Sequence, residues 1–406
     1  MKKFNKDKYL KKLRFKKYKR YLYIGIPCIL VLLIGIYFAY SKFSVFKEEE
    51  VVRTTVGEFI YGDVVIGAYI DGEYSNTIPG KNDGYVVKSV SCDNNATGSW
   101  NNDSWGIIVT NLTKRTKCNV YFETKKNSVN DVINEAVNTN SSMFASDDAD
   151  KNVRYIGKDP SNYVYFNCSD YNNQSDSTCE KWRIIGVFND VTKSDATKEN
   201  LVKIIRDKSI GNIAWDDNNV NDWSTATLQQ NLNSGTYYTT TLKNDTTRNA
   251  IEEVVWNLGG TNARNTPTAS MFYTAERGTT VYTGHATTWT GKIGLMYPSD
   301  YGYATSGETT KDRAACLAKK LQDWSSSKFS DCNGNDYLYK SNLYQWTLAP
   351  GSADAYFVFG VRPGSYVYGD GANYTRAVRP ALFLKSNIQV DKGTGEKSNP
   401  YQLKMQ

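Results

Sequence analysis

The chain has 406 residues, with 49 Lys or Arg, 42 Asp or Glu and a single histidine, His285. Its basic excess is confined to residues 1–20, where eleven Lys or Arg accompany one acid, so the remaining 386 residues carry a net charge of −3. This remainder has no basic excess with which to neutralise phosphates, so nucleic-acid binding is not expected. A single histidine also excludes most catalytic machinery that relies on a histidine general base.

Residues 1–20 form a basic tail, and residues 21–40 (YLYIGIPCILVLLIGIYFAY) follow it without any charged side chain. Twenty helical residues rise roughly 30 Å, which matches the hydrocarbon core of a membrane. We therefore expect an uncleaved N-terminal transmembrane helix at 21–40. Because basic flanks stay on the cytoplasmic side, the chain after Lys42 is expected outside the cell, as in a single-pass protein of the cell membrane.

Two other uses of this apolar segment are weighed against an anchor. A secretory signal peptide has a shorter apolar stretch of about 7 to 15 residues and a small-residue cleavage site, and only residues 39–41 offer such a site. Cys28 would suit a lipoprotein, except that Pro27 stands where lipoprotein processing needs a small residue. We expect Cys28 to be a membrane-buried thiol.

The other six cysteines fall in three neighbouring couples: Cys92 with Cys118, Cys168 with Cys179, and Cys316 with Cys332. An even number of cysteines in an extracellular setting indicates disulfides. Six cysteines allow 15 connectivities, and we favour the local one because each couple lies within one compositional block. Zinc binding is the alternative, but the sequence has no CxxC motif, so no metal is expected.

A charged stalk at 41–54 leads into residues 55–124, which have the pattern of a small β-rich domain. The runs VVIGAYI, GYVVKSVSC, WGIIVTNL and KCNVYFE are short and rich in β-branched residues, and turn signals such as Asp71-Gly72 separate them. We expect a small β-sandwich that the first cysteine couple staples, because a core of this size profits from a cross-link.

Residues 125–152 are expected to be a helical connector, since SVNDVINEAV places apolar residues at helical spacing behind Ser128, a suitable cap. Residues 153–388 form the second domain, with strand patterns at both ends (YVYFNC, WRIIGVFN, LVKIIRD; YFVFGV, YVYG, RPALFLK) and helical patterns between them (TATLQQNLN, TTRNAIEEVVWNL, ETTKDRAACLAKKLQDW). This order favours an α+β domain whose first and last strands pair. Residues 389–406 are expected to be a C-terminal tail or a final strand.

A series of motifs in the second domain resembles a known family. The series is YIGKDPSNYVYFN, WRIIGVF, IAWDD, DWSTATLQQNLN, KIGLMYPSDYGYA, YQWTLAP and VRPALFLKSN. Over residues 154–387 it resembles an uncharacterised domain of surface proteins from gut Bacillota. That domain is similar to the formylglycine-generating enzyme group within the C-type-lectin-like folds, so the resemblance implies a C-type-lectin-like α+β domain.

The resemblance has limits that bear on activity. Trp346 stands where the formylglycine-generating group has WEWT and Arg379 where it has GFR, and we expect both to be core residues. The oxidase activity is not implied, because that group holds copper with a close pair of redox cysteines and no cysteine follows Tyr344. Lectin-type calcium motifs (EPN, QPD, WND) are also missing, so calcium-dependent sugar binding is not implied. No cofactor is expected.

The stretch GVRPGSYVYGDGANYTRAV is the candidate binding site, predicted as a hairpin with an exposed turn at residues 369–371. Exposed tyrosines offer flat faces and a hydroxyl at low entropic cost, and in C-type-lectin-like domains this region often forms the ligand face. The candidate ligand-binding residues are Tyr366, Tyr368, Asp370, Tyr374 and Arg376. A surface hairpin of strand-favouring tyrosines is the structural alternative.

Two other candidate sites, residues 215–223 and His285, have simpler structural explanations. Residues 215–223 hold three carboxylates and two indoles, and oxygen-rich loops can bind Ca²⁺, but the spacing fits no EF-hand. We expect this loop to cap the helix that begins near Ser224 or Thr225. His285 would need a nucleophile and an orienting acid beside it, and the sequence has no GxSxG elbow, so we expect a surface residue.

Two functions stay open. We favour a membrane-anchored surface protein whose C-type-lectin-like domain binds a glycan, a wall polymer or a partner protein, with the β-sandwich as a spacer. The alternative is an exported enzyme that acts on wall or host carbohydrate. Glycosidases need two carboxylates roughly 5 to 10 Å apart across a cleft, and the candidate acids are Asp216, Asp222, Asp300 and Asp354.

Overall fold

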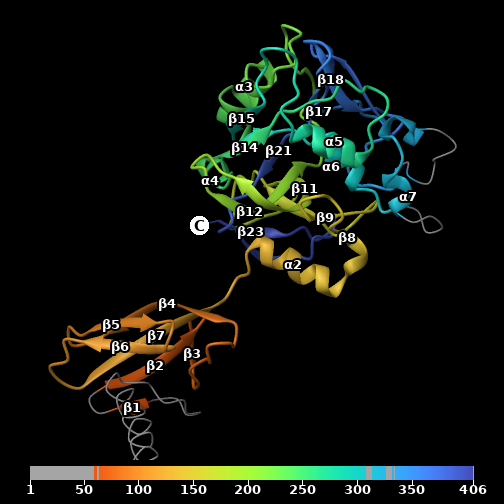
Figure 1. Ribbon diagram of the computed structural model, residues 1–406. Coiled ribbons are helices and arrows are strands. Elements are labelled where there is room, and N and C mark those ends of the chain that lie inside the picture. Colours follow the sequence, from red (N-terminus) through yellow and green to blue (C-terminus); the bar gives the residue numbers. More distant parts are fainter. Residues whose placement is uncertain (1–58, 62–63, 308–312, 326–331, 333, 406) are drawn as a thin grey trace, which may run out of the picture. The chain divides into compact units, whose positions relative to one another are not determined.

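The computed structural model describes residues 59–61, 64–307, 313–325, 332 and 334–405. The chain divides into two compact units, residues 1–125 and residues 126–406 (Figure 1). Strands predominate, at 37% against 17% helix. The predicted α+β class is therefore wrong, and the fold is strand-rich.

No helix in the part of the chain that the structure describes is long and apolar enough to cross a membrane. The predicted transmembrane helix at 21–40, its basic tail and the stalk at 41–54 lie outside the described residues. The N-terminal transmembrane element of the predicted fold class thus has no support from the structure.

The first unit is one mixed sheet with a hairpin packed on it, in place of the predicted two-sheet sandwich. The sheet has the order β1-β2-β7-β4, with β3 on β2, and β5 pairs with β6. The core holds Ile107 of the hairpin together with Val120 and Phe122. The strands are β1 (Phe59–Tyr61), β2 (Val64–Ile70), β3 (Glu73–Ser75), β4 (Tyr85–Cys92), β5 (Thr97–Asn101), β6 (Gly106–Thr110) and β7 (Thr116–Thr124).

The second unit is built on two larger sheets. The first has the order β16-β21-β12-β11-β9-β8, with β10 also paired to β11, and the second has the order β13-β20-β17-β18-β19. The strands of the first sheet are β8 (Phe144–Ala145), β9 (Val153–Tyr155), β10 (Tyr163–Phe166), β11 (Glu180–Thr192), β12 (Lys198–Arg206), β16 (Ile293–Gly294) and β21 (Ala381–Phe383). Those of the second are β13 (Asn212–Ala214), β17 (Gln345–Pro350), β18 (Phe357–Val361), β19 (Val367–Gly371) and β20 (Thr375–Ala377).

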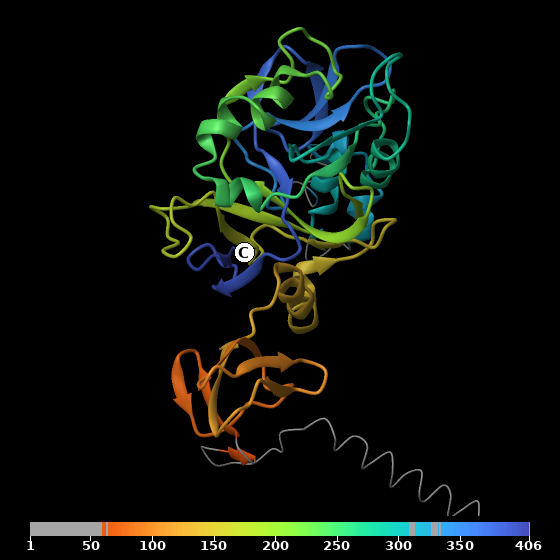
Figure 2. The same cartoon turned by 90° about the vertical axis from the view of Figure 1, so that its left-hand side faces the viewer.

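Two separate two-stranded sheets and several short helices complete this unit, and in Figure 2 the green helices lie along one flank of the strands. These sheets are β14 (Val254–Asn257) with β15 (Thr288–Gly291), and β22 (Gln389–Lys392) with β23 (Gln402–Lys404). The helices are α2 (Val129–Thr139), α3 (Thr227–Asn233), α4 (Asp245–Asn249), α5 (Ala269–Glu276), α6 (Pro298–Tyr303) and α7 (Arg313–Leu317), with shorter turns at η1 (Ser141–Met143), η2 (Tyr237–Thr241) and η3 (Leu321–Ser325).

The predicted α+β class is wrong because the sequence patterns led us to expect more helix than the structure contains. The longest described helix, α2, has 11 residues, and Ser128 caps it as expected by accepting from Asp131 N. In TTRNAIEEVVWNL only residues 246–249 are helical, because Val254, Val255 and Trp256 enter strand β14. β-Branched and aromatic side chains favour strands, so the second half of this run follows its strand propensity.

Helix α6 connects the two sheets of the second unit. It lies beside α5 and contacts β17 and β18 of the second sheet (Figure 1). Its Asp300 accepts a hydrogen bond of 2.6 Å from Lys203 on β12 of the first sheet. One hydrophobic core runs through both sheets, and Trp346 and Arg379 are buried in this unit as expected.

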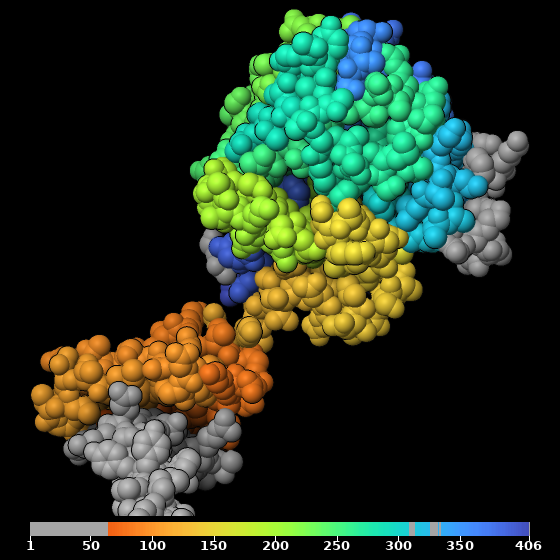
Figure 3. Space-filling view, viewed as in Figure 1, coloured from red at the N-terminus to blue at the C-terminus, as the bar shows by residue number. Residues whose placement is uncertain are grey.

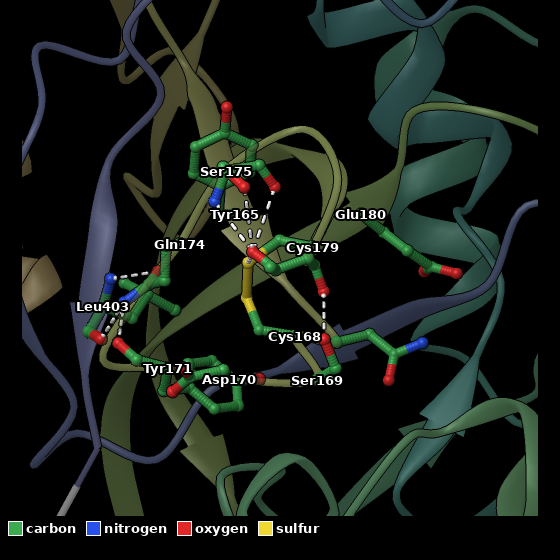
Figure 4. The surroundings of a disulfide bond; sticks show 12 residues. Tyr165, Cys168, Ser169, Asp170, Tyr171, Gln174, Ser175, Cys179, Glu180 and Leu403 are labelled. Carbon is green, nitrogen blue, oxygen red and sulfur yellow. Dashed lines mark hydrogen bonds between the residues drawn. A yellow bond between two sulfur atoms is a disulfide. The ribbon is translucent and has the colours of Figure 1, made fainter.

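All three predicted disulfides are present, which confirms the local pairing: Cys92–Cys118, Cys168–Cys179 and Cys316–Cys332. Figure 4 shows the second of them, which closes the loop after β10. Gln174 in that loop donates to Leu403 O at 2.7 Å and accepts from Leu403 N at 2.9 Å. These two hydrogen bonds tie the disulfide-closed loop to strand β23.

Candidate functional site

The predicted binding hairpin is present, but its turn lies elsewhere. Residues 369–371, expected as an exposed turn, are part of strand β19 and pair with residues 357–359 of β18. The chain turns instead at residues 362–366, where Arg362 N donates to Tyr366 O at 2.9 Å. Pro363 and Gly364 occupy this turn, and both residue types favour turns. The glycine pattern alone therefore misplaced the turn.

Four of the five predicted residues lie together with two that were not predicted. We call this cluster the Tyr-Arg patch; it consists of Tyr344, Arg362, Tyr368, Asp370, Tyr374 and Arg376. The ring centroid of Tyr344 lies close to two guanidinium groups, 4.6 Å from that of Arg362 and 4.5 Å from that of Arg376. Tyr366, the fifth predicted residue, is half-buried at the turn beside the patch.

A single carboxylate holds both arginines of the patch. Asp370 accepts from Arg376 Nη2 at 2.5 Å and from Arg362 Nη2 at 3.4 Å. The patch therefore carries two guanidinium groups against one carboxylate. Tyr374 is 55% exposed, and its ring centroid lies 5.3 Å from the guanidinium of Arg376. The arrangement presents a positive, partly aromatic surface to solvent.

Tyr344, one of the two members of the patch that the sequence did not predict, is brought to the patch by strand pairing. Tyr344 precedes β17, and its ring lies over Gly360 of β18, where an added Cβ would come within 2.6 Å of the ring. Gly360 is thus required for the ring to lie flat on the strand. Burial raises the pKa of the Tyr344 hydroxyl, which donates to Tyr368 O at 3.2 Å. Sequence patterns do not reveal such cross-strand neighbours.

Two of the three carboxylates of residues 215–223 accept hydrogen bonds from backbone N–H groups, and the helix that follows begins at Thr227, slightly later than expected. Asp216 accepts from Thr227 N, the first residue of α3, and from Val220 N, both at 3.0 Å. Asp222 accepts from Ser224 N at 3.0 Å. Among the described residues no group of three or more His, Cys, Asp or Glu could hold a metal ion.

The four acids considered for a glycosidase are all bound within the fold. Asp216 and Asp222 cap the loop before α3. Asp354 pairs with Arg264 and accepts from Phe357 N at 2.9 Å, and Asp300 is fully buried between two cations. These contacts give the enzymatic alternative no support.

His285 lies in a half-buried position beside Tyr282, with ring centroids 5.2 Å apart. Its Nδ1 has no hydrogen-bond partner among the described residues. No carboxylate of the described residues therefore accepts from Nδ1, as the orienting acid of a catalytic triad would.

Asp300 belongs to a buried charge network that the sequence did not indicate. It accepts from Lys203 Nζ at 2.6 Å and from Arg154 Nη1 at 2.7 Å, and Arg154 also donates to Asp148 at 2.7 Å. All four side chains are at most 2% exposed. Burial alone would raise the pKa of Asp300, but Lys203 and Arg154 outweigh it and hold that pKa well below its ordinary value.

Comparisons of the chain with protein-family models, curated proteins and solved structures found no match. The resemblance to a C-type-lectin-like surface domain therefore stays a prediction from the sequence motifs.

Proposed function

We propose that this chain is an extracellular binding protein that recognises an anionic glycan or wall polymer through the Tyr-Arg patch. Three disulfides fit an extracellular or secreted protein, because such bonds persist in oxidising surroundings. The observation that carries the proposal is that the guanidinium groups of Arg362 and Arg376 both lie against the ring of Tyr344, with one carboxylate serving both.

The chemistry of the patch suits an anionic sugar chain. Tyrosine faces pack against the C–H faces of sugar rings, and guanidinium groups bind carboxylate, sulfate or phosphate with paired hydrogen bonds. Asp370 restrains both arginines before a ligand arrives, which lowers the entropy lost on binding. The C-type-lectin-like resemblance supports a ligand face in the same region, and the first unit would serve as a spacer. Membrane attachment rests on the sequence of residues 1–40 alone.

The test uses the full chain on a glycan array and in cell-wall pulldown, comparing wild type with Tyr374→Ala. Because Tyr374 is exposed, its removal should change folding stability by no more than about 0.5 kcal/mol. As an aromatic anchor it should contribute about 2 kcal/mol to binding, which is roughly a thirty-fold loss of affinity.

Tyr282→Ala is the matched control, because Tyr282 is also exposed but lies outside the patch. Binding that falls equally in both variants, or that prefers neutral over acidic glycans, contradicts the proposal. Depolymerisation of a wall polysaccharide by the pure chain would favour the enzymatic alternative.

A further inference from the structure

The second unit contains a hollow that is separate from the Tyr-Arg patch. Figure 3 shows it on the front face, where blue atoms are visible between the yellow-green and teal segments. Its volume is about 190 Å³, and its walls include the rings of Phe188, Trp256, Tyr297 and Phe383. This volume exceeds that of the roughly 150 Å³ cavity that admits benzene in another protein. A molecule with one six-membered ring therefore fits.

Lys203 lines this hollow with spare hydrogen-bonding capacity. Its side chain is fully buried, and its Nζ lies 4.4 Å from the centroid of the Tyr297 ring and 5.1 Å from that of Trp256. An ammonium group has three N–H donors, and among the described residues only Asp300 accepts from this one. Buried donors without acceptors are costly, so an acceptor in the hollow would relieve this cost.

Two more donors line the same hollow. The guanidinium of Arg277 lies 5.9 Å from the Tyr297 ring, so this ring is close to both cations. Arg277 lies 3.3 Å from the centroid of the Tyr273 ring, and its polar contacts are long: 3.3 Å to Tyr273 O, 3.4 Å to Glu276 and 3.5 Å to Asp150. Asn257 also lines the hollow, and its side-chain amide makes no hydrogen bond to any described residue.

The carboxylates nearest to Lys203 and Arg277 are already engaged. Both carboxylate oxygens of Asp300 are bound, one by Arg154 and the other by Lys203 and Tyr297 N. Asp150 accepts from the Tyr273 hydroxyl at 2.5 Å. Asp190 is exposed at the rim, where solvent and salt screen its charge. A ligand carboxylate would therefore supply acceptors for the remaining N–H groups of Lys203 and Arg277.

We propose that the hollow binds a small carboxylate that carries a single ring. The carboxylate accepts hydrogen bonds from Lys203, Arg277 and Asn257. The ring packs against the aromatic walls, where Trp256 and Tyr297 supply flat faces. The site is independent of the Tyr-Arg patch, so either proposal can fail without the other.

The test is calorimetric titration of the full chain with two matched pairs, benzoate against benzyl alcohol and glucuronate against glucose. At least one acid should bind ten-fold or more tightly than its neutral partner. Preference for benzoate over benzyl alcohol would identify the ligand as an aromatic acid, and preference for glucuronate over glucose would identify it as an acidic sugar. The proposal is overturned if neither acid binds at a concentration of 10 mM, which corresponds to roughly the weakest dissociation constant of interest. Equal affinity for each acid and its neutral partner also overturns it.

Two variants locate the binding site. Arg277→Gln removes a half-exposed donor and should weaken the acid at least ten-fold, whereas Arg248→Gln removes a guanidinium paired with Asp245 outside the hollow and should not. Thr192→Trp fills the rim without changing any charge and should abolish binding, which keeps the test valid if Arg277→Gln fails to fold. Acid binding that survives in folded Arg277→Gln and Thr192→Trp places the ligand elsewhere and refutes the site.

Discussion

The Tyr-Arg patch and the buried charge network around Asp300 combine similar chemical groups under different solvation. In the patch, one aspartate holds two arginines beside tyrosine rings, and all of these side chains remain in contact with water. In the buried network, one aspartate holds Lys203 and Arg154, and all three charges are shielded from water. Water makes the ion pairs of the patch weak and replaceable, whereas burial makes each partner in the network indispensable. The comparison teaches that solvation, and not the set of residues, decides which charges support the fold.

Removal of the central carboxylate of the buried charge network should have the largest effect on stability. Asp300→Asn leaves Lys203 and Arg154 buried with reduced compensation, since Arg154 keeps only Asp148. We expect a loss of about 3–5 kcal/mol in the free energy of unfolding, measured by urea denaturation. A loss below about 1 kcal/mol would show that water reaches these charges and would break the comparison.

Glu276 should make the stability of the second unit depend on pH. Burial raises its pKa to about 7, although Arg277 and Ser299 lower it, and Asp300 raises it further. The folded state therefore holds this proton more tightly than the unfolded state, where the ordinary pKa is 4.5. The free energy of unfolding that the protonated Glu276 carboxyl contributes is fully present below pH 4.5 and is lost as the pH rises through about 7.

The variant Glu276→Gln tests this dependence, because it keeps an acceptor for Ser299 N and cannot ionise. Between pH 4.5 and 8, wild type should lose roughly 3 kcal/mol relative to this variant, measured as the difference in unfolding free energy at each pH. Parallel pH profiles for the two proteins would mean that Glu276 is solvated in the folded state.

The equivalent change in the patch should have the smallest effect. Asp370→Asn removes the carboxylate that serves Arg362 and Arg376, but both arginines keep water and the Tyr344 ring. We expect less than about 1 kcal/mol of destabilisation in the same urea assay, as for solvated ion pairs. A loss as large as that of Asp300→Asn would show that the patch is a structural cluster and not a ligand surface.

Structural features that depend on residues close together in the sequence were predicted well. The three disulfides followed from spacing, because each couple is close in the chain and a short loop closes easily. Strands β11 and β12 followed from the runs WRIIGVFN and LVKIIRD. Helices α5 and α6 were missed, since both are at most eight residues long and give little room for a helical repeat.

The sites were harder to predict because both depend on strand pairing. Tyr368, Asp370 and Arg376 lie within nine residues, so one stretch revealed them, but Tyr344 joins them through the pairing of β17 with β18 and β20. The hollow draws its lining from residues 150 to 383. Lys203 sits within an apolar strand run and gave no sign of an aromatic enclosure, which required the fold.

The pairing of β12 with β21 also has a consequence for biogenesis. Lys203 on β12 lies opposite Phe383 on β21, so the sheet joins residues 180 positions apart. During export through a membrane, β12 emerges long before its partner and presents an unpaired edge in the interval. Such distant pairing slows folding and leaves partly folded chains open to aggregation. The first sheet of the second unit is therefore completed late, and the hollow, with Lys203 and Phe383 both in its lining, forms only at that moment.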